Sequence, residues 1–267
     1  MSNSQTEKKI LFFDIDGTLY EFEKGIPESS VEALKLLKEN GHIVILCTGR
    51  PVSTVFQEVL SLPHDGIISG AGTRVEYGNK ILRNELLPNE LLMQVVPRLE
   101  KAGCIVVLEG PEYLSCHMDE ETYAQFRIVI RLREEYPERL KELEPMTDRA
   151  SKITVGIRDM EAFERMVPEL SRAFELARYE NLPYTEMMPK GISKADGIRI
   201  LLEELEIPLK NTYAFGDGPN DVEMLQYVEY GTAMGNSEAQ VLAMAPYKTE
   251  GMWEDGIYHA LKRYGLI

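Results

Sequence analysis

Strand-sized apolar runs alternate with helical patterns at the beginning of the chain, and the same rhythm returns near its end. Apolar runs at 10–13 and 42–47 flank the segment 27–40, whose apolar residues have helical spacing and which ends at Gly41. A strand, a helix and a second strand in this order form a βαβ unit with parallel strands. We therefore predict an α/β fold with a doubly wound, mostly parallel, Rossmann-like core.

Further elements of the core follow from the same patterns. In the first part of the chain they are a helix at 51–60, a strand at 66–69 and a hairpin at 73–82 that turns at Gly78 and Asn79. Near the end of the chain they are a helix at 194–205, a strand at 212–215, a helix at 221–228 and a strand at 230–234.

The rhythm changes in the middle of the chain, where neighbouring strands follow one another without a helix between them. The predicted elements are helices at 89–102, 119–143 and 160–173, and strands at 104–108, 113–117, 152–157, 175–180 and 184–188. Adjacent strands of this kind pair antiparallel. We therefore predict that residues 85–187 form an inserted α+β domain and that residues 1–84 and 188–267 form the core.

Composition narrows the classes of partner. The content of 44% hydrophobic and 27% charged residues in 267 is typical of a globular protein. No segment approaches the roughly 20 apolar residues of a membrane span, and the polar start 2–9 lacks the apolar centre of a secretory signal. The net charge of −15 opposes binding to nucleic acid or anionic lipid. We expect a cytoplasmic protein with no membrane or nucleic-acid partner, in which any phosphate-bearing ligand meets local cations.

The three cysteines, Cys47, Cys104 and Cys116, are odd in number and lie in strand-like runs. None of them forms a Cys-x-x-Cys pair. This usage predicts buried free thiols rather than a disulfide or a zinc site.

Two carboxylates follow the first predicted strand directly, in the run Asp14-Ile15-Asp16-Gly17-Thr18. Open α/β sheets bind their ligands at the carboxyl ends of the strands. Two acids followed by a glycine turn and a hydroxyl suit Mg²⁺ binding, and an aspartate can itself attack an electrophile. Taken alone, the run fits a solvated turn or a calcium loop equally well.

Two further loops follow predicted strands. Thr48-Gly49-Arg50 offers a hydroxyl and backbone N–H groups that can hold phosphate oxygens, although an N-cap threonine with a surface arginine explains it more simply. The run 216–221 presents Asp217, Asn220 and Asp221, although Asp221 could merely cap the next helix. Two acid loops on one sheet edge repel unless they share a cation, and all-oxygen ligands favour Mg²⁺ over zinc.

A lysine at the start of the helix that re-enters the core, Lys194, could oppose the charge of the acid loops and of a phosphate. A lone lysine is usually a solvated surface charge, and Lys190 competes for the same role.

The ordered motifs DIDGT, CTGR, GISK and GDGPNDVEML resemble those of the haloacid dehalogenase superfamily, and more narrowly its Cof-type phosphatases. The insert resembles the large α/β cap of that subfamily, in which the cap sets substrate specificity. The resemblance implies Mg²⁺-dependent hydrolysis of a phosphate monoester through an aspartyl-phosphate. The resemblance implies that Asp14 is the nucleophile and Asp16 the general acid and base. It implies that Thr48, with Gly49 and Arg50, binds the phosphate and that Lys194 compensates its charge. The metal would be bound by Asp14, Asp217 and the backbone carbonyl of Asp16, with Asp221 and Asn220 in positions that support the metal and the phosphate.

One departure from the family pattern lies after the third strand, where many relatives carry Asn-Gly-Ala and this chain has Ser69-Gly70-Ala71-Gly72. In the family fold that loop faces the cap entrance, so substrate preferences do not transfer directly from relatives. The residues with implied catalytic roles are unaffected.

The substrate implied by the resemblance is a small phosphorylated metabolite such as a sugar phosphate. We predict that Arg178, Tyr179, Glu186 and the hairpin 109–113 contact it, although ordinary surface or packing roles fit each residue equally well. The motifs also fit a second function, that of a phosphomutase of the same superfamily. A third alternative is a ligand-binding protein that keeps the fold without catalytic turnover.

Overall fold

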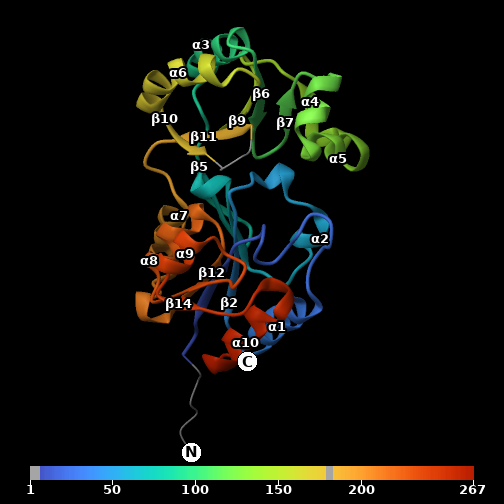
Figure 1. Cartoon of the computed structure of the whole chain (residues 1–267). Helices are drawn as coiled ribbons and strands as arrows, with labels where there is room; N and C mark the ends of the chain where they lie inside the picture. Colours follow the sequence, from blue (N-terminus) through green and yellow to red (C-terminus); the bar gives the residue numbers. More distant parts are fainter. Residues whose placement is uncertain (1–6, 179–182) are drawn as a thin grey trace, which may run out of the picture. The chain divides into compact units, whose positions relative to one another are not determined.

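The computed structural model describes residues 7–178 and 183–267, and for Arg178 the backbone only. The chain divides into two compact units. The first comprises Met1–Gly49, Phe56–Arg83 and Ser193–Ile267, and the second comprises Arg50–Val55 and Asn84–Ile192. Each unit contains one sheet (Figure 1).

The sheet of the first unit has the strand order β14-β13-β12-β1-β2-β3-β4-β5. β1 lies at its centre and pairs parallel with both β2 and β12, whereas β3 and β4 pair antiparallel. The strands are β1 (Ile10–Phe13), β2 (Ile43–Cys47), β3 (Gly66–Ser69), β4 (Arg74–Tyr77), β5 (Lys80–Asn84), β12 (Thr212–Gly216), β13 (Tyr230–Ala233) and β14 (Tyr247–Lys248). The predicted mostly parallel core is confirmed.

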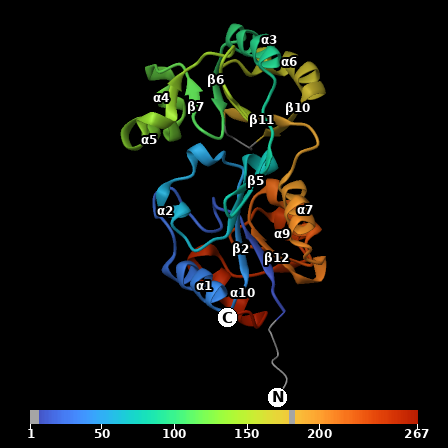
Figure 2. The ribbon, with the colours of Figure 1, turned by 180° about the vertical axis from the view of Figure 1, so that it is seen from behind.

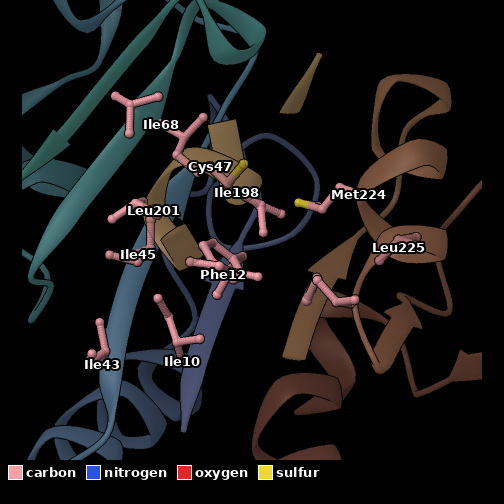
Figure 3. Packing of buried hydrophobic residues seen from close by; sticks show 14 of the residues in the cluster. Ile10, Phe12, Ile43, Ile45, Cys47, Ile68, Ile198, Leu201, Met224 and Leu225 are labelled. Carbon is pink, nitrogen blue, oxygen red and sulfur yellow. The ribbon is translucent and has the colours of Figure 1, made fainter. Parts of the chain in front are cut away.

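Helices cover both faces of this sheet, which explains why its central strands are apolar throughout. On one face, Ile10 and Phe12 of β1 pack with Ile198 of α7 and Met224 of α8 (Figure 3). The opposite face carries α1 and α10, which pack against each other (Figure 2). The helices of the first unit are α1 (Glu28–Glu39), α2 (Gln57–Leu60), α7 (Lys194–Leu205), α8 (Val222–Tyr227), α9 (Ala239–Met244) and α10 (Gly256–Arg263).

The second unit has the α+β architecture predicted for the insert, with the strand order β10-β11-β9-β6-β7-β8. One face of its sheet packs against α3 and α6, and the part of the other face formed by β6 and β7 packs against α4 and α5. Its strands are β6 (Cys104–Glu109), β7 (Leu114–Cys116), β8 (Leu140–Glu142), β9 (Lys152–Ile157), β10 (Phe174–Arg178) and β11 (Tyr184–Pro189). Its helices are α3 (Asn89–Lys101), α4 (Glu120–Gln125), α5 (Arg127–Glu135) and α6 (Met160–Ala173).

The single helix predicted at 119–143 is wrong. Phe126 has extended backbone angles, with φ −125° and ψ 99°, and separates α4 from α5. This break lets the Phe126 ring join the apolar cluster beneath the two helices. Pro137 then begins a 3₁₀ turn, after which β8 pairs parallel with β7. Burial of the phenyl ring and strand pairing thus override a pattern that was helical in its local sequence.

The helix predicted at 51–60 is also wrong, because Val55 and Phe56 are extended and divide it into a 3₁₀ turn at Val52–Thr54 and the short α2. The strand predicted at 175–180 is observed as β10 up to Arg178, and Tyr179 and Glu180 lie outside the described residues.

The three cysteines are free and buried, as predicted. Burial raises the pKa of the Cys104 thiol to about 11 and that of Cys116 to about 12, so neither forms a reactive thiolate near neutral pH. None of the helices in the described parts of the chain has the length and apolar character needed to span a bilayer.

A histidine of the second unit makes its stability depend on pH. His117 places Nδ1 2.8 Å from Glu142 Oε1 and Nε2 2.8 Å from Glu100 Oε1. Hydrogen bonds to these carboxylates, led by that of Glu142, raise the pKa of His117 above its ordinary 6.5. The stabilisation is therefore complete below pH 6.5 and disappears as the pH rises through the higher folded-state pKa.

We expect His117→Gln to remove a pH-dependent decrease in thermal midpoint that the unchanged protein shows above pH 6.5. Because the imidazole is 53% exposed, the effect is at most about 1 kcal/mol. Thermal unfolding from pH 5.5 to 8.5 measures it, and His259→Gln in the first unit serves as the control. Identical pH profiles of unchanged protein and His117→Gln would contradict the assignment.

Candidate active site

A buried lysine joins two of the predicted acids. Lys194 is the first residue of α7, whose N-terminus is held by a capping box between Ser193 and Asp196. Its Nζ lies 2.5 Å from Asp14 Oδ1 and 2.6 Å from Asp221 Oδ1. All three side chains are buried. Lys190, the competing lysine, is exposed.

The loop after β12 brings a third carboxylate to the same place. Asp221 Oδ2 accepts hydrogen bonds from the backbone N–H groups of Asp217 and Gly218, both at 3.0 Å, and so shapes the loop. Thr18, from the loop after β1, donates to Asp217 Oδ1 at 2.8 Å. One ligand atom from each of Asp14, Asp217 and Asp221 lies within 4.8 Å of the others. The two acid loops predicted to share a sheet edge therefore meet there.

Crowding of these carboxylates perturbs their ionisation. Burial raises the pKa of Asp14 well above its ordinary value, and the charge of Asp221 adds to this, whereas Lys194 opposes it. Burial and Asp221 likewise raise the pKa of Asp217 to about 7. Burial disfavours the ammonium form of Lys194, but Asp14 and Asp221 outweigh burial and raise the pKa of Lys194 well above its ordinary value. Three carboxylates beside one ammonium form an anionic site that attracts a further cation.

The donor set fits Mg²⁺. Every candidate ligand in the group is a carboxylate oxygen, which is the hard ligand that Mg²⁺ prefers. Asp14 directs Oδ1 to Lys194, which leaves Oδ2 for a metal or for phosphorus. Asp217 accepts from Thr18 through Oδ1, which leaves Oδ2 in the same way. Both oxygens of Asp221 already accept hydrogen bonds, so this residue fits a supporting position better than direct ligation.

The other predicted residues of the first unit lie on neighbouring loops. Asp16 is exposed and stands outside the buried carboxylate group. Thr48 is buried after β2, where its N–H donates to Ile68 O at 2.8 Å. Gly49 approaches Asn220 closely, since a Cβ at Gly49 would lie 3.1 Å from Asn220 Nδ2. Thr48 thus follows its strand as predicted, and Asn220, from the loop after β12, lies beside the loop that contains Gly49.

The second unit contains Arg50 and the predicted substrate contacts, including the hairpin 109–113, which connects β6 to β7. Arg50 donates from a guanidinium nitrogen to Thr54 O at 3.1 Å and is grouped with the insert rather than with Thr48 and Gly49. Glu186 lies on β11 beside Lys152. Arg178 pairs in strand register with Thr185, and its side chain, like all of Tyr179, lies outside the described part of the chain. The predicted roles of these residues stay predictions.

One residue that positions the site is absent from the predicted set. Asn236, in the loop after β13, donates from Nδ2 to Gly17 O at 2.8 Å and accepts from Met252 N at 2.8 Å. It therefore ties the loop that carries Asp14 to the C-terminal part of the chain. The Met234-Gly235-Asn236 run has the character of a turn, but nothing in its sequence indicates which distant backbone it contacts.

Gly17 leaves room for the Asp217 carboxylate where the two acid loops meet. Its φ is +84°, and a Cβ there would lie 2.2 Å from Asp217 Oδ2. Gly25 has a similar φ of +82° but no atom within 4 Å of its Cβ position. The two glycines share the same backbone strain, about 1–2 kcal/mol for a non-glycine residue, and differ only in the collision.

We expect Gly17→Ala to lower the rate of the reaction proposed below about a hundredfold. Displacement of the Asp217 carboxylate by an ångström costs that much in an aligned site. Gly25→Ala should lose stability only. The steady-state rate and the thermal midpoint are measured for both variants and compared. Equal activities in the two variants would show that the contact between Gly17 and Asp217 is unimportant.

Comparison with known proteins agrees with this arrangement. Residues 11–261 match the model of the haloacid dehalogenase-like hydrolase family. "Putative phosphatase YkrA" of Bacillus subtilis (strain 168) is 30% identical over 98% of this chain and 99% of its own. The 5-amino-6-(5-phospho-D-ribitylamino)uracil phosphatase YitU of the same strain is 27% identical over 97% of this chain and 98% of its own.

A solved structure extends the likeness to three dimensions. The HAD subclass IIB sugar phosphatase BT4131 superposes with a TM-score of 0.81 at 28% identity, over 97% of this chain and 100% of that one. The resemblance inferred from the four motifs is thereby confirmed, and the chain belongs to the haloacid dehalogenase-like hydrolase family.

Proposed function

We propose that the protein is a Mg²⁺-dependent phosphatase that hydrolyses a small phosphate monoester through an aspartyl-phosphate at Asp14. The observation that carries this proposal is the buried group in which Lys194 Nζ lies 2.5 Å from Asp14 Oδ1, with Asp217 and Asp221 close by. A carboxylate held beside a fixed cation, with further acids able to hold a metal, suits attack on a phosphorus atom.

In the first step, an oxygen of Asp14 attacks phosphorus and the alcohol leaves with its bonding electrons. Asp16 donates its proton to that alcohol. In the second step, Asp16 removes a proton from water, which attacks phosphorus and releases inorganic phosphate and the Asp14 carboxylate. The exposure of Asp16 suits this exchange with alcohol and water. Thr48, Gly49 and Asn220 donate hydrogen bonds to the phosphate oxygens, and Lys194 opposes their charge.

Asp14, Asp217 and the backbone carbonyl of Asp16 would hold the metal. Mg²⁺ supplies positive charge that screens the phosphate oxygens and the carboxylates from one another. The role of Asp221 is to fix the loop through the N–H groups of Asp217 and Gly218.

The substrate class is a sugar or sugar-alcohol monophosphate. Support comes from similar proteins whose names state a substrate, among them a sugar phosphatase and a phosphatase of a ribityl phosphate. In this proposal the second unit is the cap, the domain that contacts the alcohol part of the substrate, and residues 85–187 contain most of it.

The test is release of inorganic phosphate by the purified protein with Mg²⁺ from 4-nitrophenyl phosphate and from a panel of sugar, sugar-alcohol and nucleoside monophosphates. We expect hydrolysis of the aryl ester and faster hydrolysis of at least one sugar or sugar-alcohol ester. A phosphomutase would instead move phosphate within a hexose phosphate when a hexose bisphosphate is added. A binding protein would release no phosphate from any ester, and either result would refute the proposal.

A further inference from the structure

The peptide that carries the backbone carbonyl of Asp16 is held from its opposite side. In a trans peptide, the C=O of one residue and the N–H of the next point in opposite directions. The N–H of Gly17 donates to Tyr20 O at 2.9 Å, so this bond orients the Asp16 carbonyl. The next peptide is held as well, because Gly17 O accepts from Asn236 Nδ2 at 2.8 Å. Two successive peptide planes that follow Asp16 are therefore fixed.

A tight hairpin comes next in the chain and holds Tyr20 O in place. The N–H of Glu21 donates to Gly25 O at 2.9 Å, and the N–H of Gly25 donates to Glu21 O at 2.7 Å. The N–H of Glu21 belongs to the same peptide as the carbonyl of Tyr20, so the hairpin sets the direction in which Tyr20 O meets Gly17. The orientation of the hairpin is therefore passed on to the Asp16 peptide.

The only tryptophan in the sequence fastens this hairpin to the C-terminal part of the chain. Trp253 lies in the 3₁₀ turn Met252–Glu254 and donates from Nε1 to Glu21 Oε2 at 2.5 Å. Lys24 Nζ lies 3.0 Å from Glu21 Oε1 and 5.7 Å from the centre of the Trp253 ring. The carboxylate of Glu21 is thus held by an indole N–H and by an ammonium group.

Trp253 and Asn236 are joined to each other through the turn that contains Trp253. Asn236 Oδ1 accepts from Met252 N at 2.8 Å. The backbones of the two loops approach so closely that a Cβ at Gly235 would lie 2.6 Å from Gly251 N. Because closely packed backbones have little room to shift separately, the two side chains hold the loop after β1 at two points from one support.

The exposure of these contacts indicates that they serve geometry more than stability. Trp253 is 46% exposed, and the side chains of Glu21 and Lys24 are 41% and 60% exposed. Ion pairs at such exposure contribute little to the free energy of unfolding. The side chain of Asp16 is itself exposed, yet a general acid must lie within hydrogen-bond reach of the group that it protonates. A support for its backbone supplies that constraint.

We propose that Trp253, acting through Glu21, and Asn236, acting through Gly17, are positioning residues for Asp16. They keep in one orientation the backbone carbonyl assigned to the metal and the side chain assigned to proton transfer. The inference rests on the proposed phosphatase function. All the residues that carry it belong to the first unit.

The first experiment compares kcat/KM for phenyl phosphate and 4-nitrophenyl phosphate, because phenol leaves less readily and needs the proton of Asp16 more. Trp253→Phe keeps an aromatic ring and removes the indole N–H. We expect it to lower kcat/KM about tenfold for phenyl phosphate and less than about threefold for 4-nitrophenyl phosphate. Glu21→Ala should act in the same way, whereas Glu21→Gln, which still accepts from the indole, should keep more of the ratio between the two esters.

The matched control is Tyr247→Phe, which removes a polar atom from another partly exposed aromatic residue of the same unit. It should leave the ratio of kcat/KM for the two esters unchanged. Thermal unfolding identifies any variant that has lost its fold.

Mg²⁺ affinity and tryptophan emission provide readouts that need no turnover. In titration calorimetry we expect Asn236→Ala to raise the Kd for Mg²⁺ about tenfold, because the Asp16 carbonyl loses its fixed orientation. Asn236→Asp keeps the acceptor oxygen but not the amide donor, and should weaken Mg²⁺ binding equally. Because Trp253 is the only tryptophan, its emission reports the contact with Glu21 directly. Glu21→Ala should increase the quenching of this emission by acrylamide in metal-free buffer.

The outcomes separate this inference from the proposed function. If the unchanged protein hydrolyses no ester, the proposed function fails, whereas weaker Mg²⁺ binding by Asn236→Ala would still support the positioning role. The inference is refuted if a folded Trp253→Phe variant leaves the ratio of the two esters unchanged, or if Asn236→Ala binds Mg²⁺ as tightly as the unchanged protein. It is equally refuted if Tyr247→Phe changes the ratio as much as Trp253→Phe does.

Discussion

Asp14→Asn is expected to lower phosphate release more than a thousandfold, because an amide cannot replace the attacking carboxylate. Loss of one member of a catalytic unit costs roughly 10⁴ or more in well-studied enzymes. The substitution nearly preserves side-chain volume, so the fold should remain. Asp16→Asn should be nearly as severe, and its effect should grow for esters whose alcohol leaves poorly, since those need the proton most.

Stability separates lost chemistry from lost structure in this experiment. Burial raises the pKa of Asp14 well above its ordinary value, which means that the folded protein disfavours the ionised form. A neutral asparagine should therefore leave the thermal midpoint in metal-free buffer at or above that of the unchanged protein. Asp159→Asn, at the N-cap of α6, provides a control with the same substitution and full activity. A folded Asp14→Asn variant that keeps a tenth of the rate would exclude Asp14 as the nucleophile.

Removal of divalent metal is expected to reduce activity to background, and Mg²⁺ should restore it. Ca²⁺ should be a poor substitute because its larger and looser coordination misplaces nucleophile and phosphate. Mg²⁺ should also raise the thermal midpoint, since in the proposed site it binds Asp14 and Asp217 of the folded protein and not the unfolded chain. Phosphate release and thermal unfolding with EDTA, Mg²⁺ or Ca²⁺ provide the measurements.

Asp217→Ala should remove both responses to Mg²⁺, because it deletes a carboxylate that has one oxygen available. The comparison is Asp159→Ala, which loses a helix cap worth about 1 kcal/mol and should still gain stability from Mg²⁺. Full activity in EDTA, or an undiminished Mg²⁺ shift in Asp217→Ala, would refute the metal site.

Strands with strong local patterns were predicted well. The run Ile10–Phe13 is buried at every position, as expected for a central parallel strand, and Asp14 follows it directly. The strand that precedes Asp217 was predicted equally well. Because parallel strands place their carboxyl ends at one edge, the sequence predicted that the two acid loops meet, and the distances among their carboxylates confirm this.

Elements whose conformation depends on distant partners were predicted poorly. The charged segment 119–143 has a helical pattern throughout, yet Phe126 leaves the helix to bury its ring, and Leu140 begins a strand against β7. Local propensity is worth a few tenths of a kilocalorie per residue, whereas burial of one aromatic side chain contributes about 2 kcal/mol. Where the two compete, burial decides.

The sequence by itself determined the central strands of the core, the interruption of one fold by another and the loops that carry Asp14, Thr48 and Asp217. These features depend on hydrophobic periodicity and chain order, which are local properties. Only the tertiary structure decided which charges face each other. It placed Lys194 rather than Lys190 beside Asp14, joined Asn236 to Gly17 and assembled Lys152 with two glutamates. Contacts between residues far apart in the chain depend on strand register and side-chain direction, and one sequence contains no local record of either.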